Sequence, residues 1–574
     1  MSPGRTSTIR PSGARRKAGR PSPAALRWLA FGLFAITLAV TALTALDYGI
    51  ASDVGNYFYS SLRQIAWTRD LWSAFLEGEP STILNRDQVF EHWRWYLDRI
   101  PHPPLSRELS GLSWLLFRDL VDPLTAYRGA VMLTFAALTA SVGTYTAWRS
   151  RSVAAGLAAG LAVPAFPVLF AHGHLAHTDL FLAAFWFWSV ASLDVAVKEG
   201  GSGWFFASGL FLGAAAATKF SGLLLLPVLA VWLFVNRSGV AAFLVLCLAG
   251  ALVFFAVNPV MWVDPGQGMR DFLQAGLDRA ASDNTRITTG YFGTVYAFRP
   301  PWHYPYVWTA ITFPLSLMAA AVVGLVAPRS GALRGLVILN MAVLYGALAL
   351  PSAPMHDGVR LFLPLYPFYC VIAGAGAVAL GEWATAALKA RIPALEERRD
   401  LLVALTIVAI LAPAAFAGIR SHPHQLSWFN GLIGGIEGAQ ARGLEVTNLK
   451  EALNRESVAE LAEIIPPAAA VDPGFFIEEI CFYQAIGWAP ENWSAETQLM
   501  RRDGTEDLAL ACEGPQSFVT VALDRDAREP EYVFVLNRPA QWRRVEQALV
   551  DFGGSPAYAV SLDGVPLLMV YRTR

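Results

Sequence analysis

The sequence predicts a polytopic α-helical membrane protein that carries a small α/β domain outside the membrane. Hydrophobic residues make up 55% of the 574-residue chain, and its mean hydropathy is +0.41. Charged residues make up only 16%, whereas soluble domains carry about 25%. Eleven apolar stretches have lengths suited to helices that cross a membrane. Strand-like runs are confined to the end of the chain.

The first apolar stretch, residues 28–46, follows a strongly basic head, residues 1–27. The head has no acidic residue, and its basic residues are Arg5, Arg10, Arg15, Arg16, Lys17, Arg20 and Arg27. Because Lys and Arg next to a span are retained in the cytoplasm, we expect the head to stay there. A cleaved signal peptide is the alternative. The apolar run is long and no small-x-small cleavage site is evident, which favours an uncleaved anchor.

The other ten apolar stretches follow the same rule. They cover residues 123–148, 152–171, 177–197, 203–218, 221–236, 238–258, 304–327, 332–350, 359–380 and 401–419. If the chain alternates outward from a cytoplasmic head, every short inward connection is basic, as the positive-inside rule requires. These connections contain Arg149, Arg151, Lys198, Arg237, Arg329, Arg334, Lys389, Arg391, Arg398 and Arg399. Residues 28–425 are therefore interpreted as a transmembrane domain.

Residues 105–117 are the ambiguous stretch. Counting them as a span would reverse every later loop and would place the basic group 389–399 outside. We therefore expect a helix that lies in the membrane interface. With that assignment, the loops 47–122 and 259–303 and the tail from residue 420 face the outer aqueous side.

The tail changes character along its length. Residues 426–453 are Gly-rich and mildly apolar, which suits a segment at the membrane surface. Residues 454–574 are interpreted as a soluble α/β domain on the outer face. Its strand-like runs are 517–523, 531–536 and 565–572, and its amphipathic run is 541–553. Cys481 and Cys512 lie in this part and could form a disulfide bond in an oxidising compartment.

Charged residues and histidines that a membrane protein uses sparingly gather at the outer ends of the spans. They are Asp53, His102, His172, His174, His177, Asp179, Lys219, Arg299, His303, His356, Asp357 and Arg360. Lys219 lies in an otherwise apolar hairpin. A Lys at membrane depth costs about 2.5–3.5 kcal/mol, so it should have an anionic partner. Each residue alone could be an interfacial anchor, but the gathering of the whole set on one face favours a functional site.

Several of these residues lie in motifs of a known family. The motifs are HPPL at 102–105, HLAHTDLFLAAFW at 174–186, ATKFSGLLLLP at 217–227, PWHYP at 301–305, HDGVRLFLPLYPF at 356–368 and LSWFNGLIGGIEGA at 426–439. With Asp53 after the first span, they make the chain resemble the GT-C superfamily of polyprenyl-phosphate-sugar-dependent glycosyltransferases. The likeness is greatest to bacterial members of the dolichyl-phosphate-mannose–protein mannosyltransferase family, with the lipid A aminoarabinose transferases as relatives. Many relatives have a second acid after the first-loop Asp, whereas this chain has Val54.

The resemblance implies a sugar transfer at the periplasmic face of a bacterial inner membrane. The donor would be a sugar on a polyprenyl phosphate, and the acceptor a hydroxyl or amine on a glycan, lipid or protein. Asp53 is expected to act as the base, and Asp179 to orient the acceptor or to hold a divalent ion. The leaving phosphate needs positive charge more than a general acid. The candidate substrate-binding residues are Lys219, Arg360, His102, His303, His356 and Asp357.

Other functional classes are less well supported. The net charge of −1 does not indicate nucleic-acid binding, and the sequence has no Gly-rich phosphate loop of Walker or dinucleotide type. Three histidines within residues 172–177 are a candidate metal site without a predicted geometry, so the cofactor stays unknown. A secondary transporter is one alternative, although the chain shows no repeat and its charges are not at the midplane. A non-catalytic envelope assembly protein is the other alternative.

Overall fold

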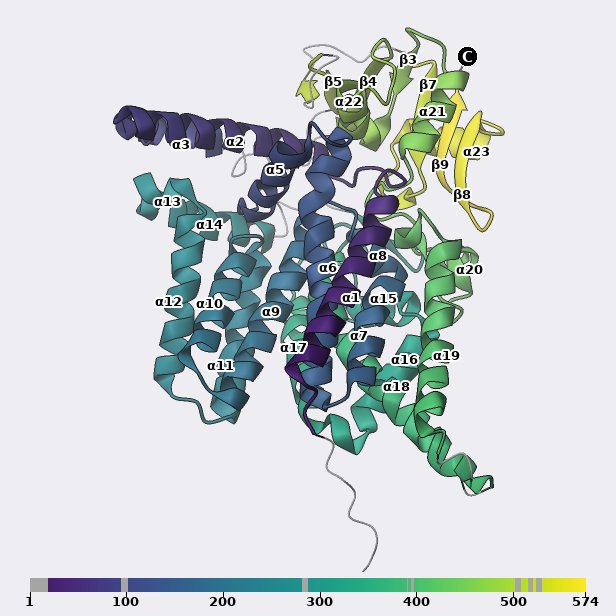
Figure 1. Ribbon diagram of the computed structural model, residues 1–574. Helices are drawn as coiled ribbons and strands as arrows, with labels where there is room; N and C mark the ends of the chain where they lie inside the picture. The colour runs from purple at the N-terminus through teal and green to yellow at the C-terminus, as the bar shows by residue number, and fades with distance from the viewer. Residues whose placement is uncertain are drawn as a thin grey trace, which may run out of the picture.

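The computed structural model describes residues 19–93, 102–280, 288–389, 391–393, 397–500, 507–514, 520–522 and 529–573. The helices form an upright bundle, and a β-sheet unit covers one end of that bundle (Figure 1). Two helices of the first outer loop, α2 (Val54–Glu77) and α3 (Arg86–Trp93), extend sideways from the same end (Figure 1). Residues 1–18 of the basic head lie outside the described residues, as do 94–101 and 281–287 of the two outer loops.

Each of the eleven predicted apolar stretches contains a helix. The helices of the bundle are α1 (Pro23–Leu43), α6 (Pro123–Ser150), α7 (Val153–Ala165), α8 (Pro167–His172), α9 (Thr178–Glu199), α10 (Ser202–Ala216), η2 (Phe220–Leu224), α11 (Leu225–Val235), α12 (Val240–Ala256), α15 (Tyr304–Thr312), α16 (Leu315–Val326), α17 (Gly331–Ala349), η4 (Arg360–Leu365), α18 (Tyr366–Lys389) and α19 (Arg399–Arg420). By length and composition, five described helices qualify as membrane spans, or six if the bent pair α15–α16 is one span. The count of eleven spans therefore stays a prediction.

Polar caps and prolines explain where several of these helices begin and break. Ser22 and Ser152 accept capping hydrogen bonds from the backbone at the starts of α1 and α7. The stretch 152–171 is divided into α7 and α8 directly before Pro167. The chain bends by 116° between α15 and α16, where Pro314 precedes the second helix. Proline lacks the N–H that would continue a helix, so these two stretches are broken rather than straight.

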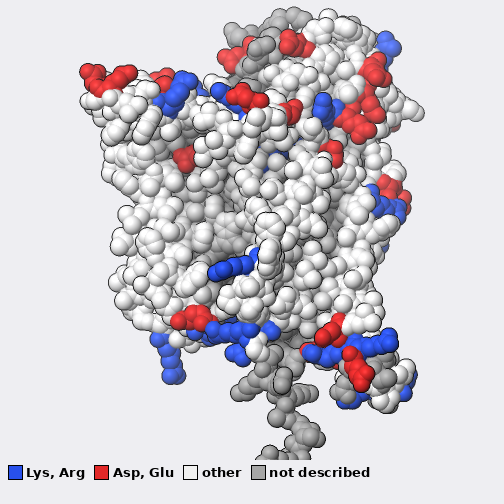
Figure 2. Space-filling view, viewed as in Figure 1, with Lys and Arg blue, Asp and Glu red and all other residues white. Residues whose placement is uncertain are grey.

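On the face that Figure 2 shows, charged residues gather at the two ends of the molecule and leave a broad belt between them that carries few charges. The end away from the sheet is rich in Lys and Arg (Figure 2). It is also the end at which α1 begins (Figure 1). A belt of apolar helix surface fits the hydrocarbon core of a bilayer. The protein is thus an integral membrane protein, and the cytoplasmic location of its basic end stays a prediction.

Short elements connect the long helices of the bundle and the C-terminal unit. The helix α5 (Leu105–Phe117) packs against α6 and α2. With 13 residues, α5 is too short to cross a membrane. This length is consistent with the predicted helix in the membrane interface. The remaining elements outside the C-terminal unit are η1 (Pro80–Thr82), α13 (Pro259–Val263), α14 (Pro265–Ala280), β1 (Thr289–Tyr291), β2 (Thr294–Tyr296), η3 (Pro328–Ser330), η6 (Gln425–Ser427) and α20 (Gly435–Ala441).

The C-terminal unit is a seven-stranded sheet with the strand order β6-β5-β4-β3-β7-β9-β8. Its elements are α21 (Arg455–Ile464), β3 (Ala470–Asp472), η7 (Gly474–Phe476), α22 (Ile477–Ala485), β4 (Ser494–Met500), β5 (Asp507–Cys512), β6 (Thr520–Ala522), β7 (Tyr532–Leu536), η8 (Pro539–Gln541), α23 (Arg544–Phe552), β8 (Tyr558–Leu562) and β9 (Val565–Arg572). The central strand β3 pairs in parallel with β4 and β7, and the other pairs are antiparallel.

The strands predicted at 531–536 and 565–572 are confirmed as β7 and β9, and the amphipathic run 541–553 contains α23. Of the run 517–523, only residues 520–522 are described, and they form β6. Cys481 of α22 and Cys512 of β5 form a disulfide bond, so the suggested pairing is confirmed. Disulfide bonds persist in oxidising compartments, which agrees with a unit that lies outside the cytoplasm. The boundary of this domain at residue 454 remains a prediction.

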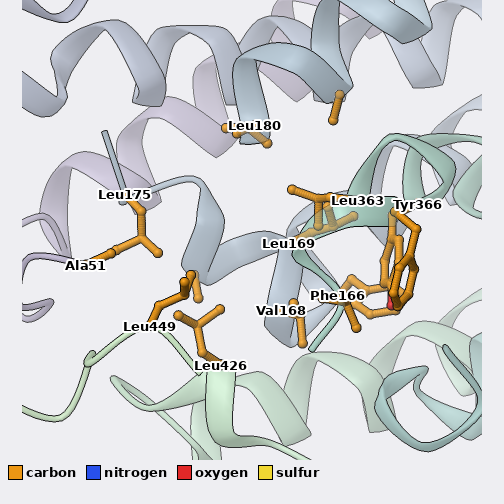
Figure 3. Close-up of a cluster of buried hydrophobic side chains, with 14 of the residues drawn as sticks. Ala51, Phe166, Val168, Leu169, Leu175, Leu180, Leu363, Tyr366, Leu426 and Leu449 are labelled. Atoms are coloured by element: carbon orange, nitrogen blue, oxygen red, sulfur yellow. The ribbon is translucent and has the colours of Figure 1, made fainter. Parts of the chain in front are cut away.

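The apolar core joins segments that are distant in the sequence. Figure 3 shows Leu169 of α8, Leu175 and Leu180 on either side of the α9 start, Leu363 of η4 and Leu449 of the Gly-rich segment. All five side chains are buried in one cluster. Burial of this apolar surface stabilises the fold and brings the start of α9, the turn η4 and the segment before the sheet together. The candidate site lies at this junction.

Candidate active site

Asp53 immediately precedes α2, at the end of the bundle that carries the sheet. Its backbone is left-handed, with φ of 69°, a conformation that costs about 1–3 kcal/mol for most residues and is common at functional sites. Its side chain makes no capping hydrogen bond to α2, so it is not an ordinary helix cap. The carboxylate Oδ2 instead lies 3.8 Å from Nη2 of Arg360 and 4.0 Å from Nε2 of His177.

Asp179 lies in the first turn of α9, where the helix dipole favours an acid. Its side chain is completely buried, with 0% exposure, and three basic side chains contact it. His177 Nδ1 and Arg360 Nε each lie 2.8 Å from Oδ2, and Lys219 Nζ lies 2.6 Å from Oδ1. A buried carboxylate requires such partners. Asp179 is therefore the centre of the charged cluster and not an isolated helix charge.

Lys219 follows α10 and immediately precedes η2. Its side chain is only 7% exposed, so it does not extend to the membrane surface as an anchor would. The turn folds closely onto α10, because a Cβ on Gly222 would lie 2.4 Å from the backbone of Ala215. The anionic partner predicted for Lys219 is confirmed, and it is Asp179.

Arg360 begins η4, the 3₁₀ turn that leads into α18. All three of its nitrogens have partners. Nε donates to Asp179 at 2.8 Å, Nη1 donates to Asp357 at 2.9 Å and Nη2 donates to His177 Nε2 at 2.8 Å. This pattern fits a His177 ring with its proton on Nδ1. A guanidinium carries five N–H groups, so Nη1 and Nη2 each have a second N–H beyond these three hydrogen bonds.

Asp357 connects this cluster to the C-terminal sheet. Its Oδ2 contacts Arg360 and lies 2.7 Å from Nδ1 of His356, and its Oδ1 accepts a hydrogen bond from Nη2 of Arg538 at 2.8 Å. Arg538 follows β7 by two residues. Like Asp53, Asp357 has a left-handed backbone, with φ of 57°. A side chain of the sheet unit thus belongs to the charged cluster.

The three carboxylates of the cluster differ in access to solvent. The side chain of Asp53 is 47% exposed, that of Asp357 is 9% exposed and that of Asp179 is fully buried. Desolvation raises the pKa of Asp53, but the contact with His177 and the charge of Arg360 outweigh it and hold the pKa below its ordinary value. The one acid that an external molecule can touch is therefore ionised.

The other candidate histidines lie at different distances from the cluster. The buried ring of His102 lies 6.5 Å from the ring of Tyr57, which is itself 5.2 Å from the ring of His177. The ring of Tyr57 therefore lies between His102 and the cluster residue His177. His303 instead shares a hydrogen bond with Tyr291 in the second outer loop, at 2.9 Å. The structure gives His303 no contact with the charged cluster within the described residues.

The histidines of the 172–177 run point to different partners. His174 stacks on Tyr48, and its Nε2 lies 2.8 Å from the hydroxyl of Thr44. His172 lines a small cavity beside Asp357, and His177 contacts Asp179 and Arg360. Among the residues that the structure describes, no three His, Cys, Asp or Glu side chains form a group that could hold a metal ion.

Two members of the cluster have no role in the sequence interpretation. His177 appears there only within the histidine run, whereas in the structure it bridges Asp179 and Arg360. Arg538 appears nowhere in that interpretation. The available signal is an Arg-Pro pair directly after a buried strand, in a position from which a side chain can leave the end of the sheet.

Residues 102–262 match the family model described as dolichyl-phosphate-mannose-protein mannosyltransferase. The matched segment contains His102, Asp179 and Lys219 with their motifs. The predicted resemblance is confirmed. Asp53 and Arg360 lie outside that segment, and their contacts with His177 and Asp179 connect them to it.

The comparison with solved structures finds two of ArnT from Cupriavidus metallidurans, one in the apo state and one bound to undecaprenyl phosphate. Each is 14% identical in sequence and has a TM-score of 0.47, and the similarity covers 95% of this chain and 98% of the ArnT chain. The comparison with curated proteins finds no matching sequence.

Proposed function

We propose that this protein is a GT-C-type membrane glycosyltransferase that moves a sugar from a polyprenyl-phosphate donor to a hydroxyl or amine acceptor. The observation that carries the proposal is the meeting of Asp53, Asp179, Lys219 and Arg360 at one end of an apolar helix bundle. Four segments far apart in the sequence bring these groups together. The match of residues 102–262 to the mannosyltransferase family supports the reaction class.

The donor phosphate would bind Arg360, with Lys219 as a second positive charge on the other side of Asp179. Nη1 and Nη2 of Arg360 each carry a second N–H beyond the three hydrogen bonds that Arg360 makes, and Nη2 also lies 3.8 Å from Asp53. When the bond between the anomeric carbon and the phosphate oxygen breaks, both electrons stay on that oxygen and the phosphate gains negative charge. Positive groups held in place beforehand stabilise this charge. A weakly basic phosphate needs no general acid.

Asp53 would be the base that removes the acceptor proton. It is the only one of the three cluster carboxylates with substantial exposure. It also lies 3.8 Å from Arg360, within reach of a sugar whose phosphate is bound there. The acceptor oxygen or nitrogen would attack the anomeric carbon as its proton passes to Asp53. A one-step displacement of this kind inverts the anomeric centre.

We assign Asp179 a role different from the one expected from its motif. An acceptor or a divalent ion could reach this buried carboxylate only by displacing Lys219, Arg360 or His177. Asp179 would therefore hold the two phosphate-binding cations in place. His356 and Asp357 would act on the donor only through Arg360, and His102 and Tyr57 would form the wall of the site beside His177.

The reaction would take place at the periplasmic face of a bacterial inner membrane. The basic end of the bundle lies opposite the sheet unit (Figure 2), and the positive-inside rule assigns such an end to the cytoplasm. The disulfide between Cys481 and Cys512 supports an oxidising compartment for the sheet unit.

The proposal is tested with purified protein in lipid nanodiscs. A polyprenyl-phosphate sugar is added, followed by envelope acceptors, and free polyprenyl phosphate is measured by mass spectrometry. Only a transferase releases polyprenyl phosphate when an acceptor is present. A secondary transporter would move the donor intact in sealed vesicles, and an assembly protein would do neither. Either of those results would overturn the proposal.

Substitution of Arg360 tests the phosphate site directly. Arg360→Ala should weaken donor binding by about 3–5 kcal/mol, because buried carboxylates and the phosphate lose their partner. Arg360→Lys should restore only part of the affinity, since an ammonium lacks the planar fork. Arg420→Ala is the matched control, because Arg420 is 65% exposed and, among the described residues, forms an ion pair only with Asp563. Equal donor affinity in Arg360→Ala and the control would exclude Arg360 from the phosphate site.

A further inference from the structure

We propose that Arg538 of the C-terminal sheet is a positioning residue for the donor-phosphate site and acts on Arg360 through Asp357. This inference rests on the proposed function, because it takes Arg360 as the residue that binds the donor phosphate. Arg538 leaves the carboxyl end of β7, a strand in the interior of the sheet. Its side chain is only 6% exposed, although it extends away from the sheet toward the helix bundle.

Three contacts hold the guanidinium of Arg538. Nη2 donates to Oδ1 of Asp357 at 2.8 Å, and Nη1 donates to the backbone oxygen of Asn448 at 3.1 Å. Nε lies 3.2 Å from Oε1 of Glu445. The same Glu445 oxygen accepts a hydrogen bond from the backbone N–H of Gly290 in the second outer loop, at 2.9 Å. One planar group therefore connects the sheet, the outer loop and the cluster, a geometry that an ammonium could not reproduce.

Asp357 is shared between two arginines, one on each carboxylate oxygen. Oδ2 serves Arg360 and Oδ1 serves Arg538. The backbone around it is closely held, because Gly358 donates its N–H to the hydroxyl of Tyr304 at 3.0 Å. Asp357 therefore cannot turn toward one arginine without losing contact with the other. The position of Arg538 fixes the direction from which Asp357 holds Arg360.

The sharing of Asp357 by two arginines also affects how strongly Arg360 attracts the donor phosphate. If Arg538 were absent, the whole negative charge of Asp357 would pair with Arg360 and would compete with an incoming phosphate. With Arg538 present, Asp357 divides its charge between two cations, and Arg360 keeps more attraction for the donor. Because the groups are buried, these interactions are screened less than those of surface charges. The sheet unit would thus tune donor binding without touching the donor.

The test uses the full-length protein in nanodiscs. Arg538→Ala should raise the KM for the polyprenyl-phosphate sugar about tenfold or more while kcat changes much less, since ground-state donor binding is what it affects. Arg538→Lys should recover part of the loss. The matched control is Arg543→Ala, which removes an arginine of the same unit that pairs with Asp472 at 3.0 Å and Glu546 at 2.9 Å and makes no contact with the cluster in the described structure.

The control separates positioning from general destabilisation. Arg543→Ala should lower the melting temperature without changing the donor KM. Equal KM values in Arg538→Ala and Arg543→Ala would overturn the inference and leave Arg538 as a structural ion pair. Asp357→Asn should abolish most of the additional effect of Arg538→Ala, because the carboxylate that transmits it is then neutral.

Failure of the proposed function would give experimental results different from those expected if only the link between Arg538 and Arg360 were wrong. If the wild-type protein neither binds polyprenyl phosphate nor releases it, the proposed function falls, and melting temperatures still decide the link from Arg538 to Arg360. The shifts of Arg538→Ala and Arg360→Ala should then combine non-additively, whereas those of Arg543→Ala and Arg360→Ala should add. Additive shifts in melting temperature for both pairs of variants would show that Arg538 and Arg360 are not coupled.

Discussion

At the scale of single residues, access to solvent separates carboxylates that are chemically alike. Asp179 is buried among cations and acts as a counter-ion, whereas Asp53 keeps one side open. Asp53 and Asp357 also share a left-handed backbone, which a non-glycine residue adopts only when its surroundings stabilise it. The fold therefore maintains strain at the two acids that flank Arg360, as is typical of functional sites.

Asp53→Asn is the sharpest residue-scale prediction. Asn tolerates left-handed backbone and keeps the size of the side chain, so folding and donor affinity should stay near those of the wild type. Turnover should fall about 10²–10⁴-fold, because the base is lost. Asp179→Asn should instead lower donor affinity and melting temperature together, since Lys219 and Arg360 lose their shared anion. Binding and single-turnover rates of both variants check this, and an active Asp53→Asn protein would assign the base elsewhere.

The pH dependence of kcat/KM follows from the depressed pKa of Asp53. Such a carboxylate stays ionised above its ordinary range of about 4, and the stability its contacts contribute is lost only as pH falls through the depressed pKa. The acid limb of kcat/KM should therefore lie below about pH 4. His177→Gln removes a contact that lowers this pKa, so its acid limb should move to higher pH. A limb that does not move would mean that another group titrates.

At the scale of elements, close approach of helix backbones positions Arg360. The helix α18, which follows η4, packs against α16 through small residues. A Cβ on Gly376 would lie 1.8 Å from the backbone oxygen of Ala320, and one on Gly324 would lie 2.1 Å from that of Ile372. Only glycine allows helices to approach this closely. The turn η4, and with it Arg360, is held in register by this contact.

Gly376→Ala should therefore separate α16 from α18. We expect it to destabilise the protein by about 1–3 kcal/mol, the usual cost of overpacking, and to weaken donor binding because η4 moves with α18. Gly346→Ala in α17 is the control, since nothing lies within 4 Å of its added Cβ. It should be neutral or stabilising by about 0.4–1 kcal/mol. Thermal unfolding of the two variants checks the prediction, which fails if both shift the melting temperature alike.

At the scale of the whole molecule, the distribution of charge and hydropathy predicts how the protein is oriented in the membrane. An apolar belt separates a basic end from the end that carries the sheet (Figures 1 and 2). In the proposed function, the cluster is where the donor phosphate and the acceptor would meet. The contact of Arg538 with Asp357 joins the sheet unit to the cluster at the end of the bundle.

Cysteine labelling tests this predicted membrane topology. In a background in which Cys247 and Cys370 are replaced by serine, Arg15→Cys and Gln547→Cys place single thiols in the basic head and on α23. A membrane-impermeant maleimide added to intact cells with a permeable outer membrane should label only residue 547, because basic segments stay inside. Equal labelling of both positions would contradict the predicted topology and, with it, the argument that the candidate site residues share an outer face. Labelling after lysis confirms that both thiols are reactive.

Patterns local to the chain determine much of this protein. Apolar stretches predict the helices, the strands at 531–536 and 565–572 follow from their composition, and the cost of a membrane-buried ammonium predicts an anion for Lys219. Motifs identify Asp53, Asp179 and Arg360 as candidates. These inferences succeed because hydropathy, turn chemistry and charge cost act over a few residues and do not depend on which distant segment lies nearby.

Only the tertiary structure shows which of those residues are exposed and which are in contact. It shows that Asp53 is exposed while Asp179 is buried, that His303 lies with Tyr291, and that Arg538 contacts Asp357 across 181 positions of sequence. The bends at residues 166 and 314 likewise decide which helix ends meet. Burial and ion pairing are properties of contacts between distant segments, so the exposed carboxylate and the arginine that contacts Asp357 cannot be distinguished until the chain has folded.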